Sequence, residues 1–183
     1  VTASAPWRGL SFGLELPAGA LDSLSLSNVV SPFTAATLLP VDALRSLLAF
    51  TNEPGHELSG TQQVASLVFH ASSPVSASVP LVPQNFSAAL ADGAALPTLL
   101  VDQGRVIVVA EQPVLDASTL ISNRHQLRLY GNPGETYQLQ TATNLSPPIF
   151  WLPFTDLVLS NIVQTVEGDT NSAPFRIYRA VKQ

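Results

Sequence analysis

The sequence contains no cysteine and no methionine, and few of its residues are charged. Without cysteine the chain forms no disulfide and no thiolate site, so packing and strand pairing alone must hold the fold. Only 11% of the residues are charged while 46% are hydrophobic, which is far from the composition of disordered chains. We therefore expect a folded protein with one large domain or two smaller ones.

Clusters of positive charge and long apolar runs are also missing. The 8 basic residues are outnumbered by 13 acidic ones, no two of them are adjacent in the sequence, and the net charge is -5. Nucleic-acid binding needs a basic patch, so we exclude nucleic acid as a partner. The longest apolar runs, such as residues 106–110, are far shorter than the roughly 20 residues of a membrane helix, so we predict no membrane span.

The missing methionine bears on where the protein is found, because the sequence starts at Val1. We expect a processed product or an excised portion of a longer chain, and removal of a signal peptide would account for this start. The prediction is therefore a secreted or cell-surface protein. Its low charge leaves much of the surface uncharged, which permits close contact with neighbouring subunits or with neutral sugars.

Regular alternation of apolar and polar residues runs through much of the chain. It is clear at residues 11–16, 23–27 and 64–71, and it is the period of a half-buried strand. Residues 106–110 are apolar without alternation, which predicts a strand covered on both faces in the middle of a sandwich. Only residues 41–50 have helical spacing, and a strand over residues 44–51 fits about as well.

A second alternating segment is interrupted by turn residues. Leu127 and Leu129 alternate with polar or aromatic neighbours, and the alternation resumes at Tyr137. Between them, Pro133 fits the second position of a type II turn and Gly134 can take the positive φ of the third. The pattern predicts a hairpin. A polar passage of small residues at 116–118 suggests a junction, so we predict domains at 1–117 and 118–183.

Two stretches resemble known sequence patterns. Residues 58–93 and 103–117 resemble the latter half of a cohesin-like β-sandwich, as found in large secreted proteins of environmental Gram-negative bacteria. Residues 127–154 and 173–183 resemble a small β module that often closes such proteins. That module has a G-x-P-G turn, an aromatic strand, a Trp and a terminal F-x-x-Y-R strand, and the matching residues here are Gly131, Pro133, Gly134, Tyr137, Trp151, Phe175, Tyr178 and Arg179.

The resemblance implies a fold class and a setting. The fold class is all-β, with a cohesin/immunoglobulin-like β-sandwich followed by a smaller C-terminal β-sandwich or barrel-like domain. It favours a strand over residues 44–51, and it implies an extracellular accessory or structural unit. The matching positions are turn glycines and core aromatics, so the resemblance carries over no catalytic residue and no ligand.

Chemically reactive groups are dispersed along the sequence. Residues 9–13 match G-x-S-x-G, but the nucleophile elbow needs a strand before the serine and a helix after it, and the residues that follow alternate as a strand. His56, His70 and His125 lack zinc-site spacing, and residues 167–171 lack the spacing of an EF-hand, so a polar turn is the favoured interpretation there. We predict no catalytic residue, no metal site, no cofactor and no enzyme activity.

The two tryptophans are the candidate interaction residues. An exposed Trp151 would stack on a sugar ring, although its apolar neighbours at residues 149–154 favour a core position. Trp7 is less constrained by its neighbours and is a candidate for an interface.

Two functions remain open on these observations. The leading hypothesis is a structural or interaction protein that self-associates, as a subunit of a surface filament, layer or adhesive stalk. Edge strands normally carry charges that prevent pairing between molecules, and this chain has few charges. The alternative is an accessory module of a larger secreted protein that binds polysaccharide or another surface protein, for which exposed coplanar aromatic rings would be the distinguishing feature.

Overall fold

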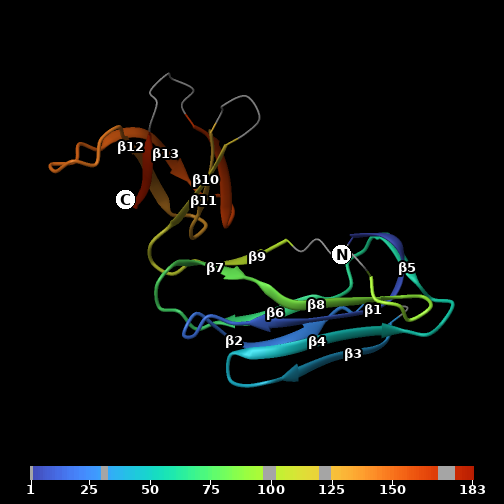
Figure 1. Cartoon of the computed structure of the whole chain (residues 1–183). Coiled ribbons are helices and arrows are strands. Elements are labelled where there is room, and N and C mark those ends of the chain that lie inside the picture. The colour runs from blue at the N-terminus through green and yellow to red at the C-terminus, as the bar shows by residue number, and fades with distance from the viewer. Residues whose placement is uncertain (1, 30–32, 97–101, 120–124, 169–175) are drawn as a thin grey trace. The chain divides into compact units, whose positions relative to one another are not determined.

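The computed structural model describes residues 2–29, 33–96, 102–119, 125–168 and 176–183. These residues form fifteen β-strands and no helix (Figure 1), which confirms the predicted all-β, sandwich-type fold class. Within the same residues, no helix is long and apolar enough to cross a membrane. The chain divides into two compact units, of which the first is Val1–Ser72 with Val79–Val106 and the second is Ser73–Ser78 with Ile107–Gln183.

The strands are numbered in their order along the chain. The first eight are β1 (Thr2–Glu15), β2 (Leu21–Ser27), β3 (Phe33–Pro40), β4 (Arg45–Asn52), β5 (Leu58–Thr61), β6 (Ser66–Ala71), β7 (Ala77–Leu81) and β8 (Pro83–Leu90). The remaining seven are β9 (Gly104–Val108), β10 (Val114–Thr119), β11 (His125–Tyr130), β12 (Thr136–Ala142), β13 (Leu152–Val158), β14 (Val163–Glu167) and β15 (Ile177–Lys182). The later division between the units falls between residues 106 and 107, inside β9, whereas the sequence places the domain junction after residue 117, inside β10.

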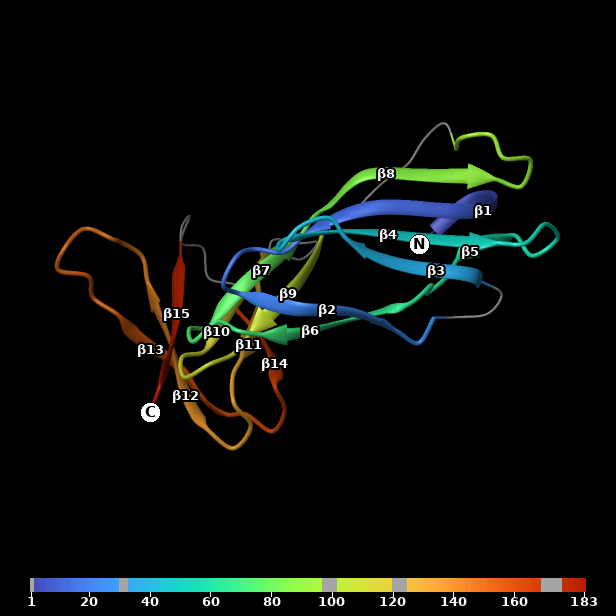
Figure 2. The ribbon, with the colours of Figure 1, turned by 90° about the horizontal axis from the view of Figure 1, so that it is seen from below.

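The first unit contains a five-stranded and a two-stranded sheet. In the larger sheet β3, β4, β1 and β5 follow one another and β8 also pairs with β1, while β2 pairs with β6 in the smaller one (Figure 2). Because side chains alternate along a strand, one face of β1 buries Leu10 and Leu14 beside Leu48 and Phe50 of β4. Apolar side chains of the smaller sheet pack against this cluster, namely Leu24, Leu26, Leu67 and Phe69.

The second unit contains two open three-stranded sheets. One has the order β10-β11-β14 and the other β13-β12-β15, and all pairs are antiparallel. Leu127 and Leu129 of β11 and Tyr137 and Leu139 of β12 are fully buried in one cluster with Leu159. These are the inward positions that the alternation predicts, so that prediction is confirmed.

The predicted turn between β11 and β12 is confirmed, but the prediction that the two strands pair as a hairpin is wrong. The N–H of Glu135 donates to the carbonyl of Asn132 (3.3 Å), and Gly134 has a φ of 88°, as a type II turn with Pro133 in second position requires. However, β11 pairs with β10 and β14, whereas β12 pairs with β13 and β15. The turn therefore carries the chain from one sheet to the other, because each strand finds its partners elsewhere in the sequence.

Two further strand predictions have different outcomes. Residues 45–52 form strand β4, so the strand is confirmed and the helix is not formed. The prediction that residues 106–110 form a strand in the middle of a sandwich is wrong. β9 ends at Val108 and pairs only with β7 among the described strands, in a two-stranded sheet rather than the middle of a larger one. Of its residues only Val108 is buried.

Candidate functional site

The structure buries Trp7 and leaves Trp151 half-buried. Trp7 is 1% exposed and its ring lies 6.0 Å from that of Phe33, in the core of the first unit. The buried position of Trp7 therefore gives no support to its prediction as an interface residue. The core position favoured for Trp151 is wrong, since its ring is only half-buried and the buried cluster of the second unit consists of Tyr137 and four leucines.

Trp151 lies beside a line of polar side chains on the sheet β13-β12-β15. The guanidinium of Arg179 lies 4.3 Å from the centre of the indole ring, and its Nε donates to Oε1 of Gln140 (2.7 Å). Gln140 donates in turn to Gln138 (2.6 Å). Gln138 then donates to Asp156 on β13 (3.0 Å). This chain of hydrogen bonds links all three strands and fixes the indole ring at the end of the sheet.

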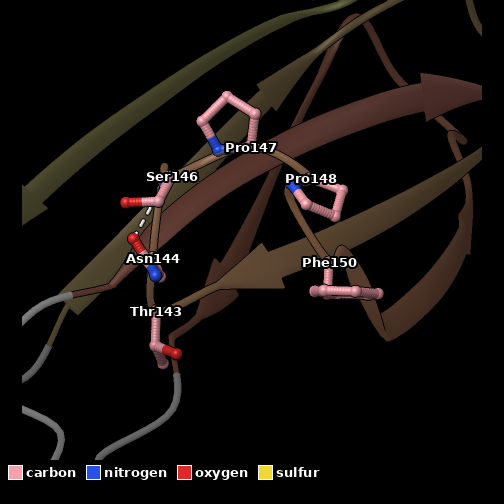
Figure 3. Close-up of a pocket in the computed structure, with 6 residues that line it drawn as sticks. All are labelled: Thr143, Asn144, Ser146, Pro147, Pro148 and Phe150. Atoms are coloured by element: carbon pink, nitrogen blue, oxygen red, sulfur yellow. Dashed lines mark hydrogen bonds between the residues drawn. The ribbon is translucent and has the colours of Figure 1, made fainter.

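The loop that precedes Trp151 lines an open hollow of about 320 Å³ (Figure 3). We call residues 143–150 the β12–β13 loop. Asn144 Oδ1 accepts the N–H of Ser146 (2.8 Å), which fixes the first half of the loop. In Figure 3, Asn144 and Ser146 lie on one side of the hollow and Pro148 and Phe150 on the other. Phe150 is 77% exposed, a large fraction for an aromatic side chain.

Strand β3 forms an edge of the larger sheet in the first unit. Among the described residues it pairs only with β4, so alternate N–H and C=O groups of its other side have no strand partner. All eight of its residues are uncharged. Ala35, Thr37 and Leu39 are exposed on the outer face, where Leu39 lies opposite the exposed Leu47 of β4.

The connection from β3 to β4 carries the nearest charges, and they pair with each other. The carboxylate of Asp42 accepts Nε of Arg45 (2.7 Å) and the backbone N–H groups of Leu44 and Arg45 (2.9 and 2.8 Å). These hydrogen bonds, that of the Arg45 side chain first, lower the pKa of Asp42 to about 2. The same pair raises the pKa of Arg45. The Asp42–Arg45 pair therefore adds no net charge to the end of β3 at neutral pH.

The reactive residues of the sequence do not come together. Ser11 lies inside β1, paired with Ala49 and Ser87, so the strand continues where an elbow would need a helix. His70 is exposed and its Nδ1 lies 2.9 Å from Asp22 Oδ1. Within the described part of the chain, no three His, Asp or Glu residues gather in a way that could hold a metal ion. Residues 169–171 of the calcium candidate lie outside the described residues.

Two features of these surfaces were missed in the sequence. Strand β3 has apolar residues on both faces, so it shows no alternation between polar and apolar positions. The partners of Arg179 could not be found because its contact with Gln140 depends on the register of β12 with β15. The alternation of Gln138 and Gln140 with buried residues was the available signal for the polar line.

The comparison with protein-family models gave no match, and the comparison with curated proteins gave none either.

Proposed function

We propose that this chain is a non-catalytic, extracellular structural or interaction protein that self-associates through strand β3. The observation that carries this proposal is an eight-residue edge strand without a charged side chain. Natural edge strands are usually shortened, bulged or charged, because an open edge pairs with other chains. Only the start of β3 has such protection, in the register shift between Phe33 and Ala35, and residues 35–40 pair regularly with β4.

The other edges of the same sheet are better protected. β5 has only four residues, and one of them, Gly60, has a φ of 68°. β8 begins with Pro83, and its pairing with β1 shifts register close to Asn85, which has a φ of 50°. Both strands lack charge, but their shortness or irregularity hinders pairing with a neighbour. The regular part of β3 is therefore the edge best suited to a second copy of the chain.

Antiparallel pairing of two β3 strands would join two copies around a two-fold axis. The same patch on both copies would make the contact, which is the commonest arrangement in homo-oligomers. The pairing would extend the five-stranded sheet and bring the outer-face Thr37 and Leu39 of both copies together. A dimer made in this way is closed, so growth into a surface filament, layer or adhesive stalk would need a second contact.

The test is to place a charge on the edge and to measure assembly. Sedimentation velocity and electron microscopy over a concentration series should show oligomers of the unchanged chain. Thr37→Lys should shift them to monomers, because the charge would be brought close to its copy across the contact. The matched control is Thr51→Lys, which adds the same charge to an exposed position of β4, a strand paired on both sides.

The result for the control gives the test its specificity. Thr51→Lys should leave the oligomers unchanged, since it does not touch the open edge. A monomer of the unchanged chain at every concentration would overturn the proposal. Equal loss of assembly in both variants would also overturn it, because net charge rather than the β3 edge would then control association.

A further inference from the structure

The β12–β13 loop has the features of a small binding site, although neither catalytic nor metal-binding groups line it. Its hollow of about 320 Å³ lies at the lower end of the range for ligand pockets. The residues that line it are Thr143, Asn144, Ser146, Pro147, Pro148 and Phe150. All six are uncharged, so the hollow offers no partner to an ionic ligand and suits a neutral one.

Three polar groups of the lining are free to bind. The hydroxyl groups of Thr143 and Ser146 have no hydrogen-bond partner among the described residues, and the same is true of Nδ2 of Asn144. The amide group donates, and each hydroxyl can both donate and accept. A ligand with several hydroxyl groups matches this set better than a hydrocarbon does.

Phe150 supplies an apolar surface opposite these groups (Figure 3). An aromatic ring that is 77% exposed leaves most of its apolar area in water, which is unfavourable unless a ligand covers it. The faces of an aromatic ring carry partial negative charge, and they attract the weakly positive C–H groups on one face of a pyranose. The hydroxyl groups around the edge of that sugar could then reach the polar side.

The loop is also prepared for binding before a ligand arrives. Pro147 and Pro148 have fixed φ angles, and the hydrogen bond from the Ser146 N–H holds Asn144. At its end the loop continues into Trp151, which is fixed by Arg179. A preformed loop loses little conformational entropy on binding, which favours affinity even in a small site.

From these contacts we infer that the β12–β13 loop binds a neutral pyranose unit of a polysaccharide, with the sugar stacked on Phe150 and its hydroxyl groups bound by Asn144, Ser146 and Thr143. The inference does not depend on the β3 contact. Phe150→Ala should leave the sedimentation of the chain unchanged, so the two proposals can fail separately.

The experiment is affinity electrophoresis of the full chain in gels that contain one soluble polysaccharide each. The neutral probes are xylan, mixed-linkage β-glucan, galactomannan and soluble starch, and the anionic control is alginate. At least one neutral probe should retard the chain and alginate should not. Phe150→Ala should weaken retardation by about tenfold in dissociation constant, and Phe150→Tyr should retain it because the ring is kept.

The matched control is Leu152→Ala. Leu152 is 63% exposed and lies two residues from Phe150, but it does not line the hollow, so its loss should leave retardation unchanged. No retardation by any neutral probe would overturn the inference, and so would an equal effect of Leu152→Ala or retardation by alginate alone. A loop that binds only an apolar protein surface would give the first of these results.

Discussion

The edge strands of the larger sheet in the first unit differ in charge from the edge strands of the second unit, although β2 of the smaller sheet in the first unit contains Asp22. In the first unit, β3, β5 and β8 contain no charged residue, whereas in the second unit β10, β13, β14 and β15 each contain at least one. Both units are antiparallel and contain a buried apolar cluster. The difference directs the search for a self-association contact to the larger sheet of the first unit.

The two units also differ in where their tryptophan lies. Trp7 belongs to the buried cluster of the first unit, while Trp151 lies at the end of a sheet in the second unit, with Arg179 over its ring. Each unit therefore contains one tryptophan in a different environment. The pair allows the stability of each unit to be followed separately, and the predictions below use this property.

The largest expected effect comes from truncating the buried tryptophan. Trp7→Ala should lower the free energy of unfolding of the first unit by about 3 to 5 kcal/mol, as loss of a buried aromatic ring does. Trp151→Ala should cost the second unit only about 1 kcal/mol, because the ring is half-buried and its contact with Arg179 is partly solvated. Urea unfolding followed by circular dichroism measures both values.

The remaining tryptophan serves as the control in each variant. In Trp7→Ala, the fluorescence of Trp151 reports on the second unit and should show an unchanged midpoint. Equal destabilisation by the two truncations would contradict the different environments described for the two rings.

A glycine in each unit gives the second prediction. A Cβ on Gly131 would lie 2.7 Å from Cζ of Tyr137 and 2.8 Å from Cδ1 of Leu159, whereas one on Gly9 would lie 3.5 Å from Cβ of Ala89. Gly131→Ala should therefore destabilise the second unit by about 1 to 3 kcal/mol through overpacking. Gly9→Ala should change the first unit by less than about 1 kcal/mol, and a larger loss there than at Gly131 would refute the packing argument. Thermal unfolding of both variants provides the comparison.

The turn between β11 and β12 in the second unit leads to the third prediction. In the second unit, the buried hydroxyl of Tyr137 accepts the N–H of Asn132 (2.9 Å) and ties the turn to the core. Tyr137→Phe should cost about 1 to 2 kcal/mol, because it leaves that N–H without an acceptor. Tyr130→Phe is the control, since its hydroxyl has no hydrogen bond among the described residues. Hydrogen exchange at Asn132 should speed up only in the first variant.

The same turn shows what could be predicted from the sequence. Pro133 and Gly134 determine the turn type through their own φ preferences, which are local and can be read from two residues. The Pro54-Gly55 turn is equally clear, with a φ of 89° at Gly55. In neither case do the flanking strands pair with each other. Pairing depends on contacts between residues far apart in the sequence, which alternation does not reveal.

The candidate site was less predictable for a related reason. Burial of Tyr137 follows from alternation, but the position of Trp151 does not, because apolar neighbours occur both in cores and in exposed loops. Here the β12–β13 loop exposes Leu145 and Phe150, and the strand that follows it exposes Leu152. Nor does composition identify an edge strand, since β3 is recognised as an edge only from its pairing.

The smallest expected effect concerns the Asp42–Arg45 pair at the end of the β3 edge. The pKa of Asp42 is lowered from 3.8 to about 2 in the folded chain. Its contribution to stability is therefore present above pH 3.8 and is lost as the pH falls through about 2, because the unfolded state binds the proton first. Both side chains are exposed to solvent, so the change in stability should be small, and NMR titration of the carboxyl carbon is the suitable measurement.

Arg45→Gln should raise the titration midpoint of Asp42 only partway toward 3.8, because the N–H groups of residues 44 and 45 still donate to its carboxylate. A midpoint near 3.8 in the unchanged chain would show that the pair is not formed, and the charges at this end of β3 would then be free to oppose pairing with a second copy.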